Sequence, residues 1–282
     1  MLTPTAELVA AAARAGRGVG AFNVIQLEHA EALVAGAEAA GAPVVLQISE
    51  NAVRYHGALE PLALATLAVA RSSSAAVAVH LDHATDVSLV HEAVRLGFGS
   101  VMYDASIMSY TDNVASTSDV AAHCRSHGVF VEAELGEVGG KDGVHAPGAR
   151  TNPTEARAYV EATGVDALAV AVGTSHAMLT RDAAIDLSLI ARLHAEVPVP
   201  LVLHGSSGVP DADLTRAVEA GMTKINIATQ LNKTFTAAVR AHLAASPDVV
   251  DTRKYLGAGR SAVADEVARL LRVLRAWPLH AM

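Results

Sequence analysis

Apolar residues along the chain gather into eight short runs, and segments of helical character lie between them. Continuous apolar runs of this length are typical of strands that are buried on both faces of a parallel sheet. They predict strands at Gly18–Val24, Ala42–Ser49, Ala76–His83, Ser100–Ser106, Val129–Leu135, Ala167–Gly173, Pro200–Gly205 and Lys224–Thr229.

The intervening segments carry helix signals. Leu27–Ala40 is rich in Ala and amphipathic, and Asp86–Leu96 and Asp211–Ala220 each open with an Asp that can cap a helix. Near the C-terminus the pattern predicts a loop over Ala244–Arg253 and a final helix over Gly259–Leu274. Strand followed by helix, eight times over, predicts a closed (β/α)8 barrel. An open doubly wound sheet is the alternative, which the number of strands disfavours.

The chain has 282 residues and shows no linker, so we expect residues 1–282 to form a single domain. Half of the residues are apolar and 4% are aromatic, which predicts a core of Ala, Val, Leu and Ile. The net charge of −8, without a basic block, gives no support for nucleic acid or an anionic membrane as partner. The only cysteine, Cys124, excludes an intramolecular disulfide and favours a cytoplasmic location. We expect no signal peptide and no membrane span.

Three histidines follow different predicted strands. His83 ends the third, His176 follows the sixth and His204 lies at the end of the seventh. Because strand ends meet at one mouth of a barrel, the three imidazoles are expected to converge. Three imidazoles with an open fourth position are typical of a catalytic zinc site. The simpler interpretation is that one or more of them only caps a strand.

Acidic residues lie at the same predicted mouth. Asp104 and Glu134 end neighbouring strands, and they form either a buried polar pair or a second position for the metal. Asp82 directly precedes His83, where a carboxylate can orient a metal ligand or move a proton of the substrate. The spacing alone does not choose between these roles.

Small polar residues follow the last two strands, at Gly205–Gly208 and Asn226–Thr229. Loops at this place in barrels commonly bind phosphate through backbone N–H groups and a helix N-terminus. We therefore predict a phosphate site there.

Over nearly its full length the chain resembles class II fructose- and tagatose-bisphosphate aldolases. The segments that carry the resemblance are Gly20–Val24, Leu81–His83, Tyr103–Ser106, Val131–Gly136, Thr163–Asp166, Gly173–His176, His204–Gly208, Lys224–Thr229 and Asp251–Lys254. The resemblance implies a zinc ion on His83, His176 and His204, and an alternative metal position at Asp104 and Glu134. It implies that Asp82 exchanges the proton of the C4 hydroxyl. It also implies a bound monovalent cation such as Na+ or K+.

For the substrate, the resemblance implies a ketose bisphosphate, and it also suggests a homodimer or homotetramer. The residues matching positions around the dihydroxyacetone-phosphate half are Asn23, Ser49, Gly205, Ser206, Ser207, Asn226, Ile227, Ala228 and Thr229. Arg253 matches an arginine that meets the second phosphate in some members.

Cleaving a ketose between C3 and C4 leaves negative charge beside a carbonyl, which a metal can stabilise as a Lewis acid. Aldolases of the other class use a lysine Schiff base instead. The lysines here are Lys141, Lys224, Lys233 and Lys254. We expect Lys224 at the start of the eighth strand, on the wrong face, which disfavours the Schiff-base route.

The chain departs from the family pattern at two places. Ala177 replaces the Gly that usually follows the histidine of the sixth motif. The loop Gly139–Gly143 lacks the family's glutamate for proton transfer at the enediolate carbon, and Asp142 or Glu137 could substitute for it. We expect Asp142 to act as this acid. Both departures bear on the substrate more than on the fold.

Three other functions compete with this one. A related aldolase could act on another phosphorylated ketose or a keto-acid, and a degenerate homologue could bind a sugar phosphate without catalysis. A zinc amidohydrolase is disfavoured, because Phe22-Asn23-Val24 stands where such barrels have His-x-His. The stereochemistry at C4, which separates fructose from tagatose substrates, stays open.

Overall fold

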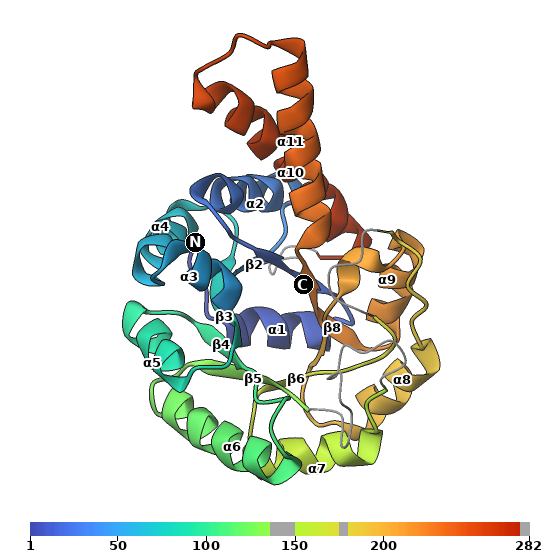
Figure 1. Cartoon of the computed structure of the whole chain (residues 1–282). Helices are drawn as coiled ribbons and strands as arrows, with labels where there is room; N and C mark the ends of the chain where they lie inside the picture. The colour runs from blue at the N-terminus through green and yellow to red at the C-terminus, as the bar shows by residue number, and fades with distance from the viewer. Residues whose placement is uncertain (136–149, 175–179, 277–282) are drawn as a thin grey trace.

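The computed structural model describes residues 1–135, 150–174 and 180–276. Eight parallel strands close into a barrel in chain order, each paired with the next and β8 paired with β1. Helices surround the strands, which confirms the predicted (β/α)8 barrel (Figure 1). The strands are β1 Val19–Asn23, β2 Val44–Ser49, β3 Val77–Ala84, β4 Ser100–Tyr103, β5 Phe130–Glu134, β6 Ala167–Ala169, β7 Leu201–Leu203 and β8 Met222–Ile227.

Several predicted strands were too long at their C-terminal ends. β6 stops at Ala169, yet Val170 and Val172 beyond it remain buried. Residues that leave the ladder but stay in the core continue the apolar run, so hydrophobicity alone does not mark the strand end. β8 was misplaced at its start, which lies at Met222 rather than Lys224.

The helices of the described residues are α1 Thr5–Arg14, α2 Leu27–Ala40, α3 Glu50–His56, α4 Glu60–Ser72, α5 Val87–Leu96, α6 Tyr110–Ser126, α7 Pro153–Thr163, α8 Leu187–Glu196, the 3-10 turn η1 Ser206–Gly208, α9 Asp211–Glu219, α10 Thr229–Ala245 and α11 Thr252–Val273. Asp86 caps α5 as predicted, because its carboxylate accepts from the Ser88 N–H at 2.8 Å. Gly41 ends α2 with φ 61°, in the left-handed region that glycine tolerates. No helix in the described part of the chain is long and apolar enough to cross a membrane.

Helix α1, which the apolar pattern did not predict, covers the N-terminal end of the barrel. Leu8 and Val9 are fully buried there against Val19, Val45 and Ala78, near the beginnings of their strands. The interior is therefore closed at this end by packed aliphatic side chains, and the site lies at the opposite end.

Helices α10 and α11 form a hairpin that projects from the barrel at the top of Figure 1. The predicted loop over Ala244–Arg253 was too long and the predicted last helix too short, because α11 already begins at Thr252. Gly259, taken as a helix start, instead lies inside α11, where a Cβ would come within 2.7 Å of the Phe235 ring of α10. The glycine permits close contact between the two helices.

Candidate active site and metal centre

A break in the pairing of β3 shapes the site. The β3–β4 register shifts between Leu81 and Ala84, and His83 has φ 50°, which is uncommon for a residue other than glycine. In a regular strand Asp82 and His83 would point to opposite faces. With the irregularity both side chains reach the same cavity. The strain at His83 therefore lies where two neighbouring residues serve one site.

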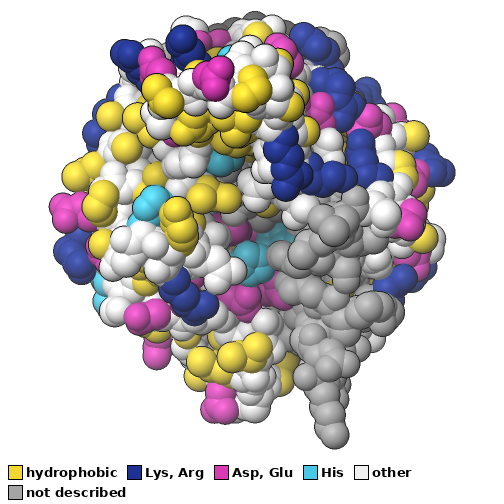
Figure 2. Space-filling model, turned by 45° about the horizontal axis from the view of Figure 1, so that its top comes forward, with side chains coloured by type: hydrophobic (Ala, Val, Ile, Leu, Met, Phe, Trp, Pro, Cys, Tyr) yellow, Lys and Arg dark blue, Asp and Glu magenta, His cyan; other side chains and the backbone are white. Residues whose placement is uncertain are grey.

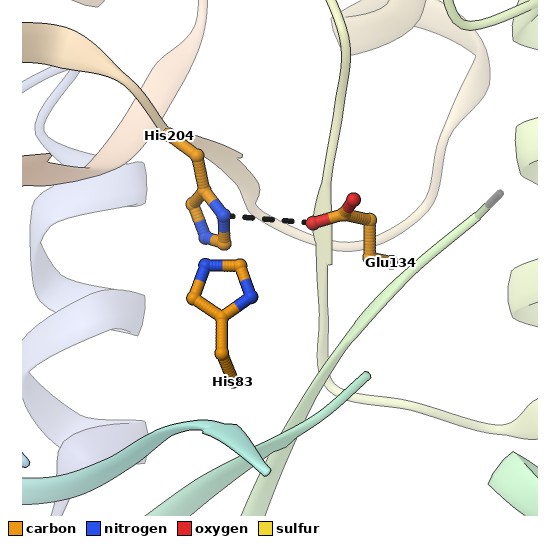
Figure 3. A group of neighbouring side chains, drawn as sticks. All are labelled: His83, Glu134 and His204. Carbon is orange, nitrogen blue, oxygen red and sulfur yellow. Dashed lines mark ion pairs between the residues drawn. The ribbon is translucent and has the colours of Figure 1, made fainter. Parts of the chain in front are cut away.

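His83, Glu134 and His204 converge from β3, β5 and the end of β7. One candidate ligand atom from each lies within 4.8 Å of the other two. Figure 3 shows the three side chains pointing toward one another, with an ion pair of 3.5 Å between His204 Nδ1 and Glu134 Oε2. The third predicted histidine, His176, lies outside the described residues, as do Glu137, Asp142 and Ala177.

Asp104 lies behind His83, not in this group. Its Oδ2 is 2.8 Å from His83 Nδ1, and its Oδ1 accepts from the Ser106 N–H at 3.1 Å and hydroxyl at 2.6 Å. Burial alone lowers the pKa of His83, but the carboxylates of Asp82, Asp104 and Glu134 outweigh it and raise that pKa to about 9. Burial works against ionisation of Asp104 too, yet the contacts with His83 and Ser106 lower its pKa.

His204 is oriented in a similar way. Its Nε2 lies 2.9 Å from Oε1 of Glu132, a fully buried residue of β5. Each histidine thus has one ring nitrogen engaged by a carboxylate, which turns the other toward the centre of the group. Histidines held by outer carboxylates are typical of zinc sites. Two imidazoles and a carboxylate are a donor set that zinc accepts, so the residues fit this metal.

Asp82 is 4% exposed and directly precedes His83, a member of the His83, Glu134 and His204 group. Its Oδ2 accepts from Asn23 Nδ2 at 3.3 Å, and its Oδ1 accepts from Asn226 Nδ2 at 3.4 Å. Gln47 in turn donates to Asn23 Oδ1 at 2.8 Å. Two amides from β1 and β8 therefore set the plane of this carboxyl group.

A cavity of about 730 Å³ opens over these residues. Figure 2 shows the hollow, with acidic and histidine side chains gathered in it. Most of the residues that the resemblance assigned to the substrate line it: Asn23, Ser49, Gly205, Ser207, Asn226, Ala228 and Thr229. Ser206 and Ile227 are buried and do not line it; Ser206 donates to the Leu203 carbonyl at 3.1 Å and Ile227 packs in the core.

Arg253 does not line this cavity. It lies in the first turn of α11 with its side chain 89% exposed, and its guanidinium pairs with Asp251 at 2.8 Å. Among the described lining residues the only Lys or Arg is Arg54 of α3. Its side chain donates to Asn51 Oδ1 at 3.3 Å and pairs with Glu50.

The expected position of Lys224 was wrong. It lies inside β8, two residues before Asn226, so both side chains face the barrel interior. Its Nζ is 2.8 Å from Glu132 Oε2 and donates to Asn226 Oδ1 at 2.9 Å. Sequence reasoning also missed Glu132, although its spacing of two from Glu134 places both on one face of β5.

The comparisons with known proteins agree with this architecture. Residues 3–277 match the family described as class II fructose-bisphosphate aldolase. The crystal structure of the YdjI aldolase from Escherichia coli K12 is 28% identical, with a TM-score of 0.87 over 98% of each chain. A putative fructose-1,6-bisphosphate aldolase from Coccidioides immitis is 26% identical, with a TM-score of 0.85 over 96% of each chain.

A fructose-bisphosphate aldolase from Campylobacter jejuni is 20% identical, with a TM-score of 0.80 over 97% of this chain and 95% of the other. At that identity the likeness shows a shared fold only. The match to the family extends over nearly the whole barrel, including every strand. The chain therefore belongs to the class II fructose-bisphosphate aldolase family.

Proposed function

We propose that this protein is a zinc-dependent aldolase that reversibly cleaves a ketose phosphate, fructose 1,6-bisphosphate or tagatose 1,6-bisphosphate, to dihydroxyacetone phosphate and an aldehyde. The observation that carries the proposal is the convergence of His83, Glu134 and His204, of which His83 lines the same cavity as Asp82. Membership of the class II family gives independent support.

His83 and His204 would hold the zinc ion, together with His176, and Glu134 with Asp104 would offer the alternative position. When bound, zinc supplies Lewis-acid stabilisation of the negative charge that develops as the carbon–carbon bond breaks. The hydrogen bonds that the two imidazoles donate to Asp104 and Glu132 would hold them in the orientation that a metal needs.

Asp82 would take the proton from the C4 hydroxyl as the C3–C4 bond breaks, and return it in the condensation direction. Its two amide contacts, from Asn23 and Asn226, hold the carboxylate in a defined orientation. Asp82 directly precedes His83 and lines the same cavity, so the proposed base would lie next to a residue that would hold the metal.

The phosphate of the dihydroxyacetone-phosphate half would bind between Gly205 to Ser207 and the start of α10 at Thr229. The first backbone N–H groups of a helix lack partners within the helix and attract anions. Ser207 already receives the N–H of Gln230 at 3.2 Å, which joins the two segments. A monovalent cation such as Na+ or K+ would complete this phosphate site.

Asp142 would be the acid that exchanges the proton at the dihydroxyacetone-phosphate carbon. The test compares solvent proton exchange into dihydroxyacetone phosphate by Asp142→Ala and Glu137→Ala. We expect slow exchange and normal zinc content in the Asp142 variant alone. Loss of exchange only in the Glu137 variant would assign the role to Glu137.

We further propose a cytoplasmic homodimer or homotetramer acting on a small-molecule sugar phosphate. The alternatives are an aldolase for another phosphorylated ketose or a keto-acid, and a non-catalytic sugar-phosphate-binding homologue. Arg54 bears on the choice, because it is the only Lys or Arg among the described lining residues and would meet an anionic far end of the substrate.

The deciding experiment is a cleavage assay over a panel of ketose phosphates that includes both C4 epimers, with the products identified and the zinc content measured. We expect about one zinc ion per chain, loss of cleavage on chelation and recovery with zinc, cobalt or manganese. Full activity in a metal-free preparation, or inactivation by borohydride with substrate, would contradict the zinc mechanism. Zinc binding without cleavage of any member of the panel would favour the non-catalytic alternative.

A further inference from the structure

A buried ion pair lies inside the barrel beneath the site, and the proposed mechanism does not use it. Lys224 of β8 is 1% exposed and Glu132 of β5 is fully buried, and their charged atoms are 2.8 Å apart. Buried ion pairs are poor stabilising devices, because aliphatic residues of similar volume often serve the fold equally well. The pair calls for an explanation other than stability.

Each member of the pair makes a second contact, and each contact leads to the site. On one side Glu132 Oε1 lies 2.9 Å from His204 Nε2. Since a carboxylate only accepts, His204 carries its hydrogen on Nε2, and Nδ1 faces Glu134 at 3.5 Å. Glu132 thus decides which nitrogen of His204 is presented to a metal.

On the other side Lys224 donates to Asn226 Oδ1 at 2.9 Å. An ammonium group has no acceptor, so this contact fixes the amide of Asn226 with its oxygen toward Lys224 and its NH2 group away. The NH2 group then donates to Asp82 Oδ1 at 3.4 Å. A reversed amide would turn its oxygen toward the Asp82 carboxylate, where the two would repel.

We propose that Lys224 is a positioning residue that orients both halves of the site at once, the metal ligand His204 through Glu132 and the base Asp82 through Asn226. The inference rests on the proposed function and extends it to a residue that touches neither metal nor substrate. One ammonium group holds the Glu132 carboxylate in place on one side and sets the direction of the Asn226 amide on the other.

The test uses Lys224→Met, which replaces the side chain by an unbranched, uncharged one that is a single atom shorter. We expect the dissociation constant of zinc to rise by about 10-fold or more, as for loss of other outer partners of metal ligands. We also expect kcat at saturating zinc to fall by about 10-fold or more, with the absorption spectrum of the cobalt-loaded protein changed. Glu132→Gln should affect zinc affinity more than kcat, because it lies on the metal side alone.

The matched control is Thr5→Val, which removes a fully buried hydroxyl 2.7 Å from Ser100 Oγ at the far end of the same interior. It should lower the melting temperature and leave zinc affinity and kcat unchanged. If Lys224→Met behaves like Thr5→Val, Lys224 has a structural role only and the proposal is overturned.

Lys224→Met leaves Glu132 buried without its cation and could fail to fold. The double variant Glu132→Leu/Lys224→Met removes both charges and should restore the melting temperature. It should still bind zinc weakly and turn over slowly, whereas parent-like affinity and kcat would refute the proposal. The parent enzyme separates the two ideas: zinc-dependent cleavage by the parent supports the proposed function whatever the Lys224 variants do.

Discussion

The raised pKa of His83 predicts that protons compete with zinc up to an unusually high pH. The perturbation is a change of pH from 7 to 9 with the metal-free protein. His83 Nδ1 donates to Asp104, so the nitrogen that would bind the metal is Nε2. At a pKa of about 9 this nitrogen carries a proton throughout most of the neutral range. Zinc must therefore displace that proton.

The magnitude follows from the fraction of deprotonated His83. With a pKa of about 9, this fraction is about 1% at pH 7 and about 50% at pH 9, so the zinc association constant should rise about 50-fold. With the ordinary pKa of 6.5, the same change of pH would raise it by less than about twofold. The two expected rises in the zinc association constant differ by more than about an order of magnitude.

The assay is competition for zinc against a chelator whose own pH dependence is known, supported by calorimetry in buffers of different ionisation enthalpy. We expect about one proton to be released from His83 per zinc bound at pH 7.5. Asp104→Asn removes one of the carboxylates that hold the proton, so in that variant the affinity should level off at a lower pH. An association constant that stays flat from pH 7 to 9 in the parent would refute the reasoning.

Three further predictions concern the same site. Asp82→Asn should lower kcat by about 10²–10⁴ and retain zinc, as measured by steady-state kinetics and metal analysis; loss of zinc would make Asp82 a ligand or an orienting group. In the metal-free protein the raised pKa of His83 contributes stability that is fully present below pH 6.5 and is lost as pH rises through about 9. The free energy of unfolding in urea should therefore decrease by about 3 kcal/mol over this range, and the zinc-loaded protein should lack this decrease. Arg54→Gln should raise KM about 10-fold for a ketose bisphosphate but leave it nearly unchanged for a ketose 1-phosphate with an uncharged far end, and equal effects on both would remove Arg54 from substrate recognition.

The barrel could be predicted because strands that are buried on both faces appear as apolar runs, and because glycines such as Gly41 mark the helix ends. The convergence of His83 and His204 also followed from the sequence, since the ends of parallel strands share one mouth. Neither inference needs the pairing register of any strand.

What depends on register could not be predicted. The irregularity in β3 that brings Asp82 and His83 to one cavity has no signature in the letters of the strand. Lys224 was expected at the start of β8 because the strand was taken to begin two residues late, and its assignment to the wrong face overlooked the spacing of two from Asn226, which implies a shared face. Helix α1 was missed because its closing of the barrel depends on three-dimensional packing against several strands.

The irregularity in β3 also limits how the gene can change. Asp82 and His83 are the only residues between Leu81 and Ala84, so a deletion there would remove one of the two side chains together with the irregularity. An insertion there would lengthen the irregular stretch and change the directions in which the two side chains point. We therefore expect the length of this short stretch to tolerate change less well than the identity of the aliphatic residues around it.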